Sequence, residues 1–177
     1  RFRCRTRKAP ACGRGRSGLS APVMTETRDE RHMRRALALA QAAAEAGEAP
    51  IGAVIVDPGS DEVLAEAHNR PVAAHDPTAH AEMLALRAAA SRIGNYRLTG
   101  LELFVTLEPC AMCAGAISHA RIGRLVYAAA DPKGGAVAHG PRFFDQPTCH
   151  WRPDAVQGPF AQEAGEMLRA FFRARRG

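Results

Sequence analysis

The sequence contains no internal repeat and no apolar run that approaches the ~20 residues a helix needs to cross a bilayer. This absence argues against a membrane-spanning protein. A chain of 177 residues, of which 46% are hydrophobic, is long enough to bury a core of its own. We therefore expect one globular domain without a membrane partner.

Acidic residues are absent from positions 1–23, which hold seven of the 24 basic residues. Residues 24–177 therefore carry 17 basic and 18 acidic side chains, a net charge of −1, although the whole chain has a formal charge of +6. The overall basicity thus gives no support for a nucleic-acid partner of the folded part. We expect 1–23 to be a disordered leader or upstream read-through before a start at Met24, and 24–177 to be the domain. A transit peptide and an RNA-contacting arm are the alternatives for 1–23.

Cysteine is scarce, and two of the five cysteines lie in the first 23 residues. The remaining three are Cys110, Cys113 and Cys149, an odd number of which two are spaced as Cys-x-x-Cys. This usage favours metal ligation in a reducing compartment over a disulfide framework. We therefore expect a cytoplasmic protein.

Apolar runs and helical periodicities alternate along the chain. They predict helices at 28–46, 76–93, 109–119 and 160–175, and strands at 51–56, 62–68, 101–107, 125–130 and 154–157. We expect Asp76 to cap the second helix, with Pro77 in its first position. The segment 131–153 is predicted to be irregular. This alternation predicts an α/β fold, a three-layer α/β/α sandwich around a central mixed sheet.

Two short clusters carry the candidate chemistry: His80-Ala81-Glu82, and the Cys-x-x-Cys pair Cys110 and Cys113 after a proline. Three soft ligands without a fourth are typical of a catalytic zinc site, which keeps one position open. Each cluster lies at a predicted helix start, where backbone N–H groups favour the thiolate form of cysteine. We expect one Zn²⁺ per subunit on His80, Cys110 and Cys113.

Glu82 lies two residues from His80 and is free to exchange protons rather than ligate. Because zinc lowers the pKa of bound water to about 7, a nearby carboxylate can accept the water's proton and pass it to a leaving group. This combination suits hydrolytic removal of an amino group from an aromatic ring. A closed structural zinc site is the alternative, and its fourth ligand would come from His75, Cys149 or His150.

Longer strings around the two clusters resemble the bacterial tRNA-specific adenosine deaminases, within the cytidine deaminase-like zinc deaminases, over roughly residues 31–176. His-x-Glu followed by Pro-Cys-x-x-Cys is the signature of the whole superfamily. The more specific strings are HNRP at 68–71, HDPTAHAE at 75–82, NYRL at 95–98, TLEPCAMCAGA at 106–116, HARI at 119–122, DPK at 131–133 and FFR at 171–173. The segment 134–151 departs from the family pattern.

The resemblance implies a cytidine deaminase-like fold and a hydrolase that converts adenosine to inosine at the wobble position of a tRNA anticodon loop. It implies that His80, Cys110 and Cys113 are the zinc ligands and that Glu82 is the catalytic proton shuttle. It also implies that Asn69 contacts the flipped-out base and that Asp131 contacts the nucleotide backbone. Members of the family are homodimers, so the partners implied are a second copy and a tRNA anticodon stem-loop.

Two other functions stay open at this point. One is a free-base or nucleoside deaminase, of the guanine or cytosine type, which the near-neutral charge of 24–177 favours. The other is a non-catalytic zinc module that binds RNA, against which Glu82 argues. Near the C-terminus, an acid-free basic stretch with Arg169, Arg173, Arg175 and Arg176 either binds phosphates or is simply a solvated helix end. One of Phe171 and Phe172 is expected in the core, because adjacent residues cannot share one helix face.

Overall fold

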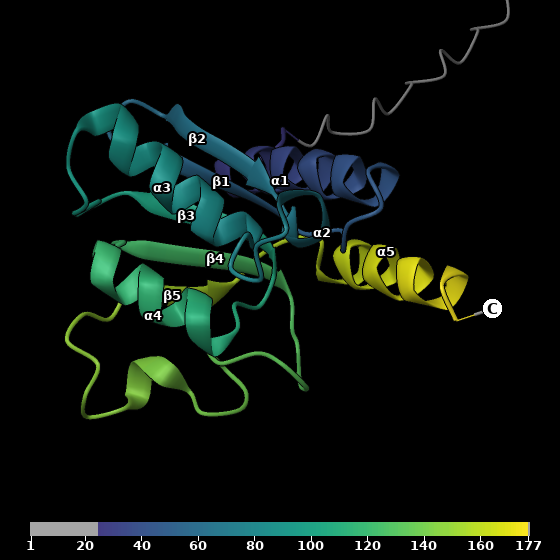
Figure 1. The fold of residues 1–177 in the computed structure, drawn as a ribbon. Helices are drawn as coiled ribbons and strands as arrows, with labels where there is room; N and C mark the ends of the chain where they lie inside the picture. Colours follow the sequence, from purple (N-terminus) through teal and green to yellow (C-terminus); the bar gives the residue numbers. More distant parts are fainter. Residues whose placement is uncertain (1–24, 177) are drawn as a thin grey trace, which may run out of the picture.

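The computed structural model describes residues 25–176, so the predicted leader lies outside the described residues. Five strands form one sheet in the order β2-β1-β3-β4-β5 (Figure 1). The strands are β1 (Gly52–Asp57), β2 (Glu62–His68), β3 (Glu102–Leu107), β4 (Arg124–Ala129) and β5 (Asp154–Gln157). β1 runs antiparallel to β2 and β3, whereas β3, β4 and β5 are mutually parallel. The sheet is therefore mixed, as predicted.

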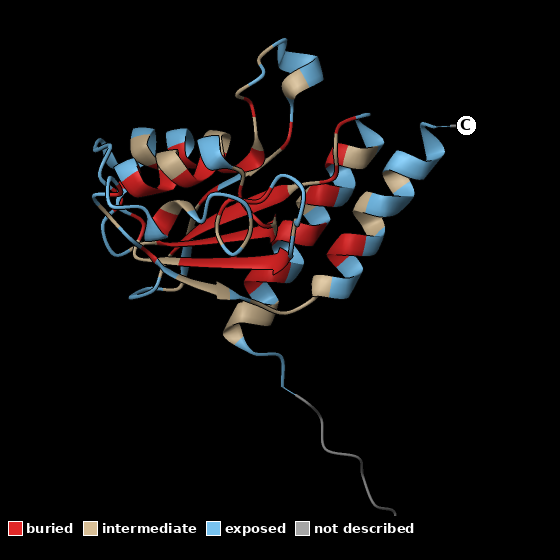
Figure 2. Ribbon diagram, turned by 90° about the horizontal axis from the view of Figure 1, so that it is seen from below, coloured by how far each residue is buried: buried red, intermediate tan, exposed pale blue. Residues whose placement is uncertain are grey.

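Helices cover both faces of this sheet. α1 (Arg28–Glu45) and α5 (Ala161–Ala174) pack on one face, and α3 (Ala81–Ile93) and α4 (Ala111–Ala120) pack on the other. Figure 2 shows the buried strands between the two helical layers. Two apolar clusters, one on each face, form the core, so the three-layer α/β/α architecture is confirmed. No helix in the described part of the chain is long and apolar enough to cross a membrane.

α1 lies unusually close to the sheet. Its start is fixed by a reciprocal capping pair, Thr27 and Glu30, and its buried stripe includes Met33, Ala36 and Ala40. A Cβ atom on Gly52, at the start of β1, would lie 2.1 Å from the carbonyl oxygen of Ala36. Only glycine therefore allows this approach between the helix and the strand.

Three local predictions are wrong. The helix expected from Asp76 begins at Ala81, because the Asp76 carboxylate instead accepts hydrogen bonds from the backbone N–H and the hydroxyl of Thr78 in a local turn. Cys110 is likewise the N-cap of α4 rather than a residue inside its first turn. Neither adjacent phenylalanine of α5 is in the core, since Phe172 is 43% exposed and Phe171 is half-buried beneath Arg175.

Two short helices were not predicted. They are α2 (Pro71–Ala74), which follows β2, and the 3-10 helix η1 (Phe143–Asp145), which lies inside the segment predicted to be irregular.

Candidate metal centre and active site

The three predicted ligands meet at two neighbouring helix starts. His80 is the N-cap of α3, Cys110 is the N-cap of α4, and Cys113 lies in the first turn of α4. The His80 Nδ1 atom is 3.7 Å from the Cys110 Sγ atom and 3.5 Å from the Cys113 Sγ atom. The three donor atoms all lie within 4.8 Å of one another.

These separations fit a single tetrahedral zinc ion. Bond lengths of about 2.0–2.1 Å to nitrogen and 2.3 Å to sulfur place the two donors about 3.6 Å apart, which agrees with the observed nitrogen–sulfur distances. Within residues 25–176 no fourth histidine, cysteine or carboxylate joins the group. Cys149, one of the alternative ligands, is instead hydrogen-bonded to Ser118 and to the carbonyl of Trp151. The donor set is therefore that of an open site.

The pKa values of the two thiols are shifted in opposite directions. A hydrogen bond from the Cys113 thiol, together with one from His80, lowers the pKa of Cys110 to about 4, although burial opposes this shift. The same hydrogen bond to Cys110, together with burial, raises the pKa of Cys113. Bonding to Cys110 also raises the pKa of His80. At least one thiolate is therefore favoured at this site, as metal binding requires.

Glu82 lies in the first turn of α3 and is only 4% exposed. Burial raises the pKa of its carboxyl group. Its Oε2 atom is buried and has no hydrogen-bond partner among the described residues. A buried oxygen without a partner costs stability, and such groups concentrate where a protein carries out chemistry.

Asn69 is held beside the site by a hydrogen bond with the backbone of α3. Its side chain is buried, and its Oδ1 atom accepts a hydrogen bond of 2.8 Å from the N–H of Ala81, the residue after His80. The short helix α2, which follows Asn69, is held by a buried carboxylate, Glu48, which accepts hydrogen bonds from the N–H groups of Val72 and Ala73. The structure thus brings Asn69 beside the metal ligands.

Asp131 lies at the start of the loop after β4, and its carboxylate is engaged within that loop. Its Oδ1 atom accepts hydrogen bonds from the N–H groups of Lys133 and Gly134, each 3.1 Å long. The same loop pairs Gly135 with Cys110 in a β-bridge. Asp131 therefore belongs to a segment that adjoins the metal cluster, but its Oδ1 atom serves that segment's own turn.

Two buried glutamates beside the site were missed by the sequence reasoning. Glu108 precedes the metal-binding motif, and Glu48 follows α1. In Glu108, burial acts to raise the pKa of the carboxyl group, but hydrogen bonds from Asp131 and His139 outweigh it and the pKa is lowered. The position of Glu108 inside a motif string was the only signal for it, and Glu48 had none.

A model of the cytidine and deoxycytidylate deaminase zinc-binding region matches residues 26–129, a span that includes every predicted ligand. The tRNA-specific adenosine deaminase of Agrobacterium fabrum is 54% identical over 81% of this chain and 93% of its own length. A solved structure described in a study of A-to-I editing by tRNA:A34 deaminases at the wobble position is 51% identical, with a TM-score of 0.75 over 77% of this chain and 98% of that one. The guanine deaminase of Bacillus subtilis is 34% identical, with a TM-score of 0.56 over 83% of this chain and 92% of that one.

Proposed function

The chain belongs to the family of zinc-dependent deaminases that the cytidine and deoxycytidylate deaminase zinc-binding region defines, and on this basis we propose that it deaminates adenosine to inosine at the wobble position of a tRNA anticodon loop. The observation that carries the proposal is the cluster of His80, Cys110 and Cys113 beside the unpaired buried oxygen of Glu82. The A. fabrum relative, which is named a tRNA-specific adenosine deaminase and aligns over most of both chains, supports the choice of substrate.

His80, Cys110 and Cys113 would hold one zinc ion per chain, because their donor atoms have the spacing that zinc requires and Cys110 favours the thiolate form that binds it. When bound, zinc supplies the Lewis acidity that activates water for attack on a ring carbon. The protein contributes the position of the ligands, since both helix starts are fixed by the core on the same face of the sheet.

Glu82 moves the protons of the reaction. Its carboxylate accepts a proton from the attacking water and returns it to the amino group at C6 of adenine, which leaves as ammonia while oxygen takes its place. Burial suits this role, because it raises the pKa of Glu82 toward the range in which a carboxyl group both accepts and donates.

Asn69 is suited to orient the purine. Its Oδ1 atom is used by Ala81, whereas no hydrogen bond joins its NH₂ group to the described residues, so this group is free to donate to an acceptor on the base. We assign Asp131 to the nucleotide backbone near the target base, through the oxygen that its own turn does not use.

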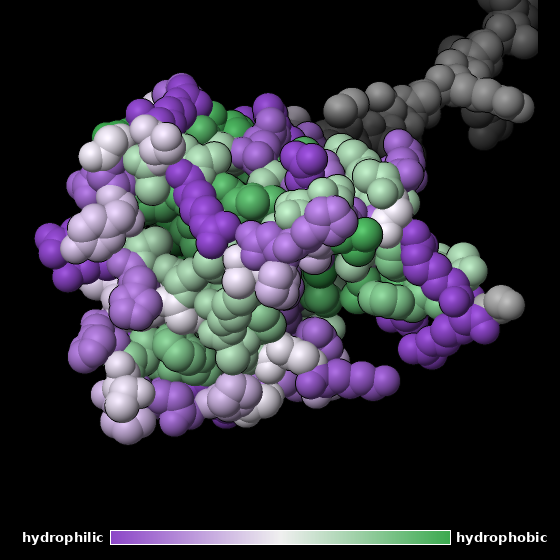
Figure 3. Space-filling view, viewed as in Figure 1, coloured by the Kyte–Doolittle hydropathy of each residue, from purple (hydrophilic) through white to green (hydrophobic). Residues whose placement is uncertain are grey.

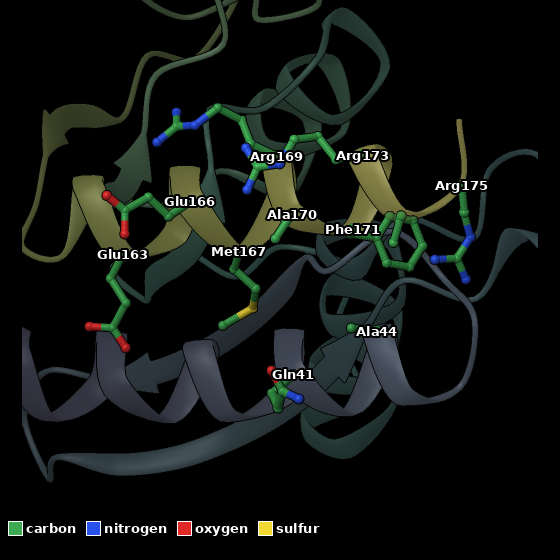
Figure 4. A pocket seen from close by; sticks show the side chains of 11 residues that line it. Gln41, Ala44, Glu163, Glu166, Met167, Arg169, Ala170, Phe171, Arg173 and Arg175 are labelled. Carbon is green, nitrogen blue, oxygen red and sulfur yellow. The ribbon is translucent and has the colours of Figure 1, made fainter. Parts of the chain in front are cut away.

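A basic groove between the 131–134 loop and α5 supports RNA as the partner. Its cationic lining is Lys133, Arg169, Arg173 and Arg176. Figure 4 shows that Arg169 and Arg173 project away from α1, whereas Met167 points toward it. In Figure 3 the surface at this C-terminal helix combines apolar and hydrophilic areas. Phe172 also lines the groove and is 43% exposed, which suits stacking on an unpaired base.

The resemblance further supports a homodimer and, since tRNA is the substrate, a cytoplasmic location. Sedimentation analysis of the purified chain tests the dimer: a monomer at the concentrations used for the activity assay would refute it.

An assay with zinc-loaded protein tests the proposed reaction. An anticodon stem-loop with adenosine at the wobble position is incubated with the wild type and with Glu82→Ala, and inosine is measured; free guanine and cytidine serve as parallel substrates. We expect inosine from the wild type, and zinc retention without turnover from the variant. Ammonia released from guanine or cytidine, with no inosine, would replace the proposal by a free-base or nucleoside deaminase. No product from any substrate would favour a non-catalytic module.

A further inference from the structure

The side chain of Glu108 is fully buried immediately after β3, two residues before Cys110. Its carboxylate accepts hydrogen bonds from four backbone N–H groups, at 3.0 Å from Asp131, 3.1 Å from Val137, 2.8 Å from Ala138 and 3.0 Å from His139. The Nδ1 atom of His139 lies 2.7 Å from its Oε2 atom. Every one of these contacts is made to a single loop, residues 131–139.

This loop is shaped around the Glu108 carboxylate. A Cβ atom on Gly135 would lie 2.5 Å from the Glu108 Cδ atom, so only glycine permits the loop to pass over the carboxylate. Residues 131–139 contain no helix and no strand. Since hydrogen bonds to a charged acceptor are the strong ones, Glu108 is the main organiser of the loop.

The loop lies between the metal cluster and the basic groove. On one side, the N–H of Ala136 donates to the carbonyl of Pro109, and Gly135 pairs with Cys110. On the other side, Asp131, Lys133 and Gly134 line the groove against α5. The position of these groove residues therefore depends on the hydrogen bonds that Glu108 accepts.

We propose that Glu108 is a positioning residue for the RNA substrate: it holds the 131–139 loop so that Asp131 and Lys133 face the groove, without itself touching the reacting atoms. This inference rests on the proposed function. It assigns Glu108 to substrate binding rather than to zinc binding, because the zinc ligands are fixed by the starts of α3 and α4.

The test compares Glu108→Gln with Glu102→Gln. Glu102 is a buried glutamate at the opposite end of β3 that pairs with Arg28, so its substitution removes a buried charge from the same strand without touching the loop. The measurements are zinc content, hydrogen–deuterium exchange of residues 131–139, and KM and kcat on the anticodon stem-loop. For Glu108→Gln we expect full zinc content, about tenfold faster exchange in the loop and about a tenfold higher KM with a much smaller change in kcat. Glu102→Gln should show neither loop exchange nor a KM effect.

His139→Ala provides a milder variant if Glu108→Gln does not fold. It removes the side-chain contact and leaves the four backbone hydrogen bonds, so we expect a smaller rise in loop exchange and in KM. Unchanged exchange and KM in the folded Glu108 variant would overturn the proposal, as would loss of zinc and of kcat with KM unchanged. A wild type that makes no inosine would refute the proposed function instead, and the exchange measurement would still decide whether Glu108 holds the loop.

Discussion

Asn69 combines a structural role and a proposed substrate role in one amide, and two substitutions separate them. Its Oδ1 atom accepts the 2.8 Å hydrogen bond from the Ala81 N–H at the start of α3. The N-cap residue, His80, makes no side-chain capping bond. Asn69, which is remote from α3 in sequence, therefore caps this helix in place of His80. Asn69→Ala removes both the acceptor and the NH₂ group, whereas Asn69→Asp keeps an acceptor and loses only the NH₂ group.

The expected cost follows from the burial of this contact. Removing the acceptor leaves a buried N–H without a partner, which costs about 1–3 kcal/mol and compares with about 0.5–2 kcal/mol for loss of a helix cap. We take about 2 kcal/mol, which lowers the melting temperature by about 4–8 °C in a domain of this size. Asn69→Asp places a negative charge at a helix start, where it is favoured, so we expect a smaller loss of stability. Both variants should lose about tenfold or more in kcat/KM, because both lack the amide donor.

The assays are thermal unfolding of the zinc-loaded proteins, followed by circular dichroism, and inosine formation on the anticodon stem-loop. An Asn69→Ala protein that melts with the wild type would refute the capping role. An Asn69→Asp protein with wild-type kcat/KM would refute the role of the NH₂ group and leave the capping role intact.

Three further predictions concern packing, acid stability and RNA affinity. Gly52→Ala should lower the free energy of unfolding by about 3 kcal/mol or prevent folding, because the new Cβ atom would lie 2.1 Å from a backbone oxygen. Gly115→Ala is the control: its new Cβ atom meets a side chain only at 3.7 Å, so this variant should melt no lower than the wild type. Hydrogen bonds from His32, Arg28 and Arg31 hold the pKa of Asp61 below its usual 3.8, so the contribution of Asp61 to stability is complete above that pH and is lost as the pH falls. The melting temperatures of the wild type and Asp61→Asn should therefore differ at neutral pH and converge in acid, and a constant difference would contradict this. Arg173→Gln should weaken stem-loop binding and reduce the slope of log affinity against log salt by about 1. Arg35→Gln loses an ion pair with Glu66 away from the groove, so it should leave this slope unchanged.

The sequence predicted the elements whose signal is local. β2 and β5 occupy the predicted residues, and α1 ends one residue earlier than expected, because alternating or periodic apolar residues report directly on burial. The start of α3 was misplaced because Asp76 and Pro77 are typical of a helix N-terminus and equally typical of a turn. The choice between the two depends on Asn69, which caps the helix from 12 residues away.

Local sequence signals likewise identify the proposed zinc ligands but not the residues that support them. His80, Cys110 and Cys113 are recognisable because zinc restricts both the residue types and their spacing. Glu108 and Glu48 have hydrogen-bond partners 23–31 and 24–25 residues away, respectively, and no periodicity marks a charged residue as buried. Their roles depend on segments that are remote in sequence and close in space, the 131–139 loop for Glu108 and α2 for Glu48.

The charge on this molecule is neutralised unevenly, which reconciles an almost neutral domain with an RNA substrate. Many arginines on and around α1 and the sheet are paired, as Arg124 is with Asp29 and Arg34 is with Glu26. Within the described chain, no ion pair involves Arg169, Arg173 or Arg176, which line the groove beside Asp131. Because salt screens charges beyond about 8–10 Å, an RNA phosphate in this groove responds to the unpaired arginines rather than to the net charge of the domain. A net charge near zero therefore does not argue against RNA as the substrate.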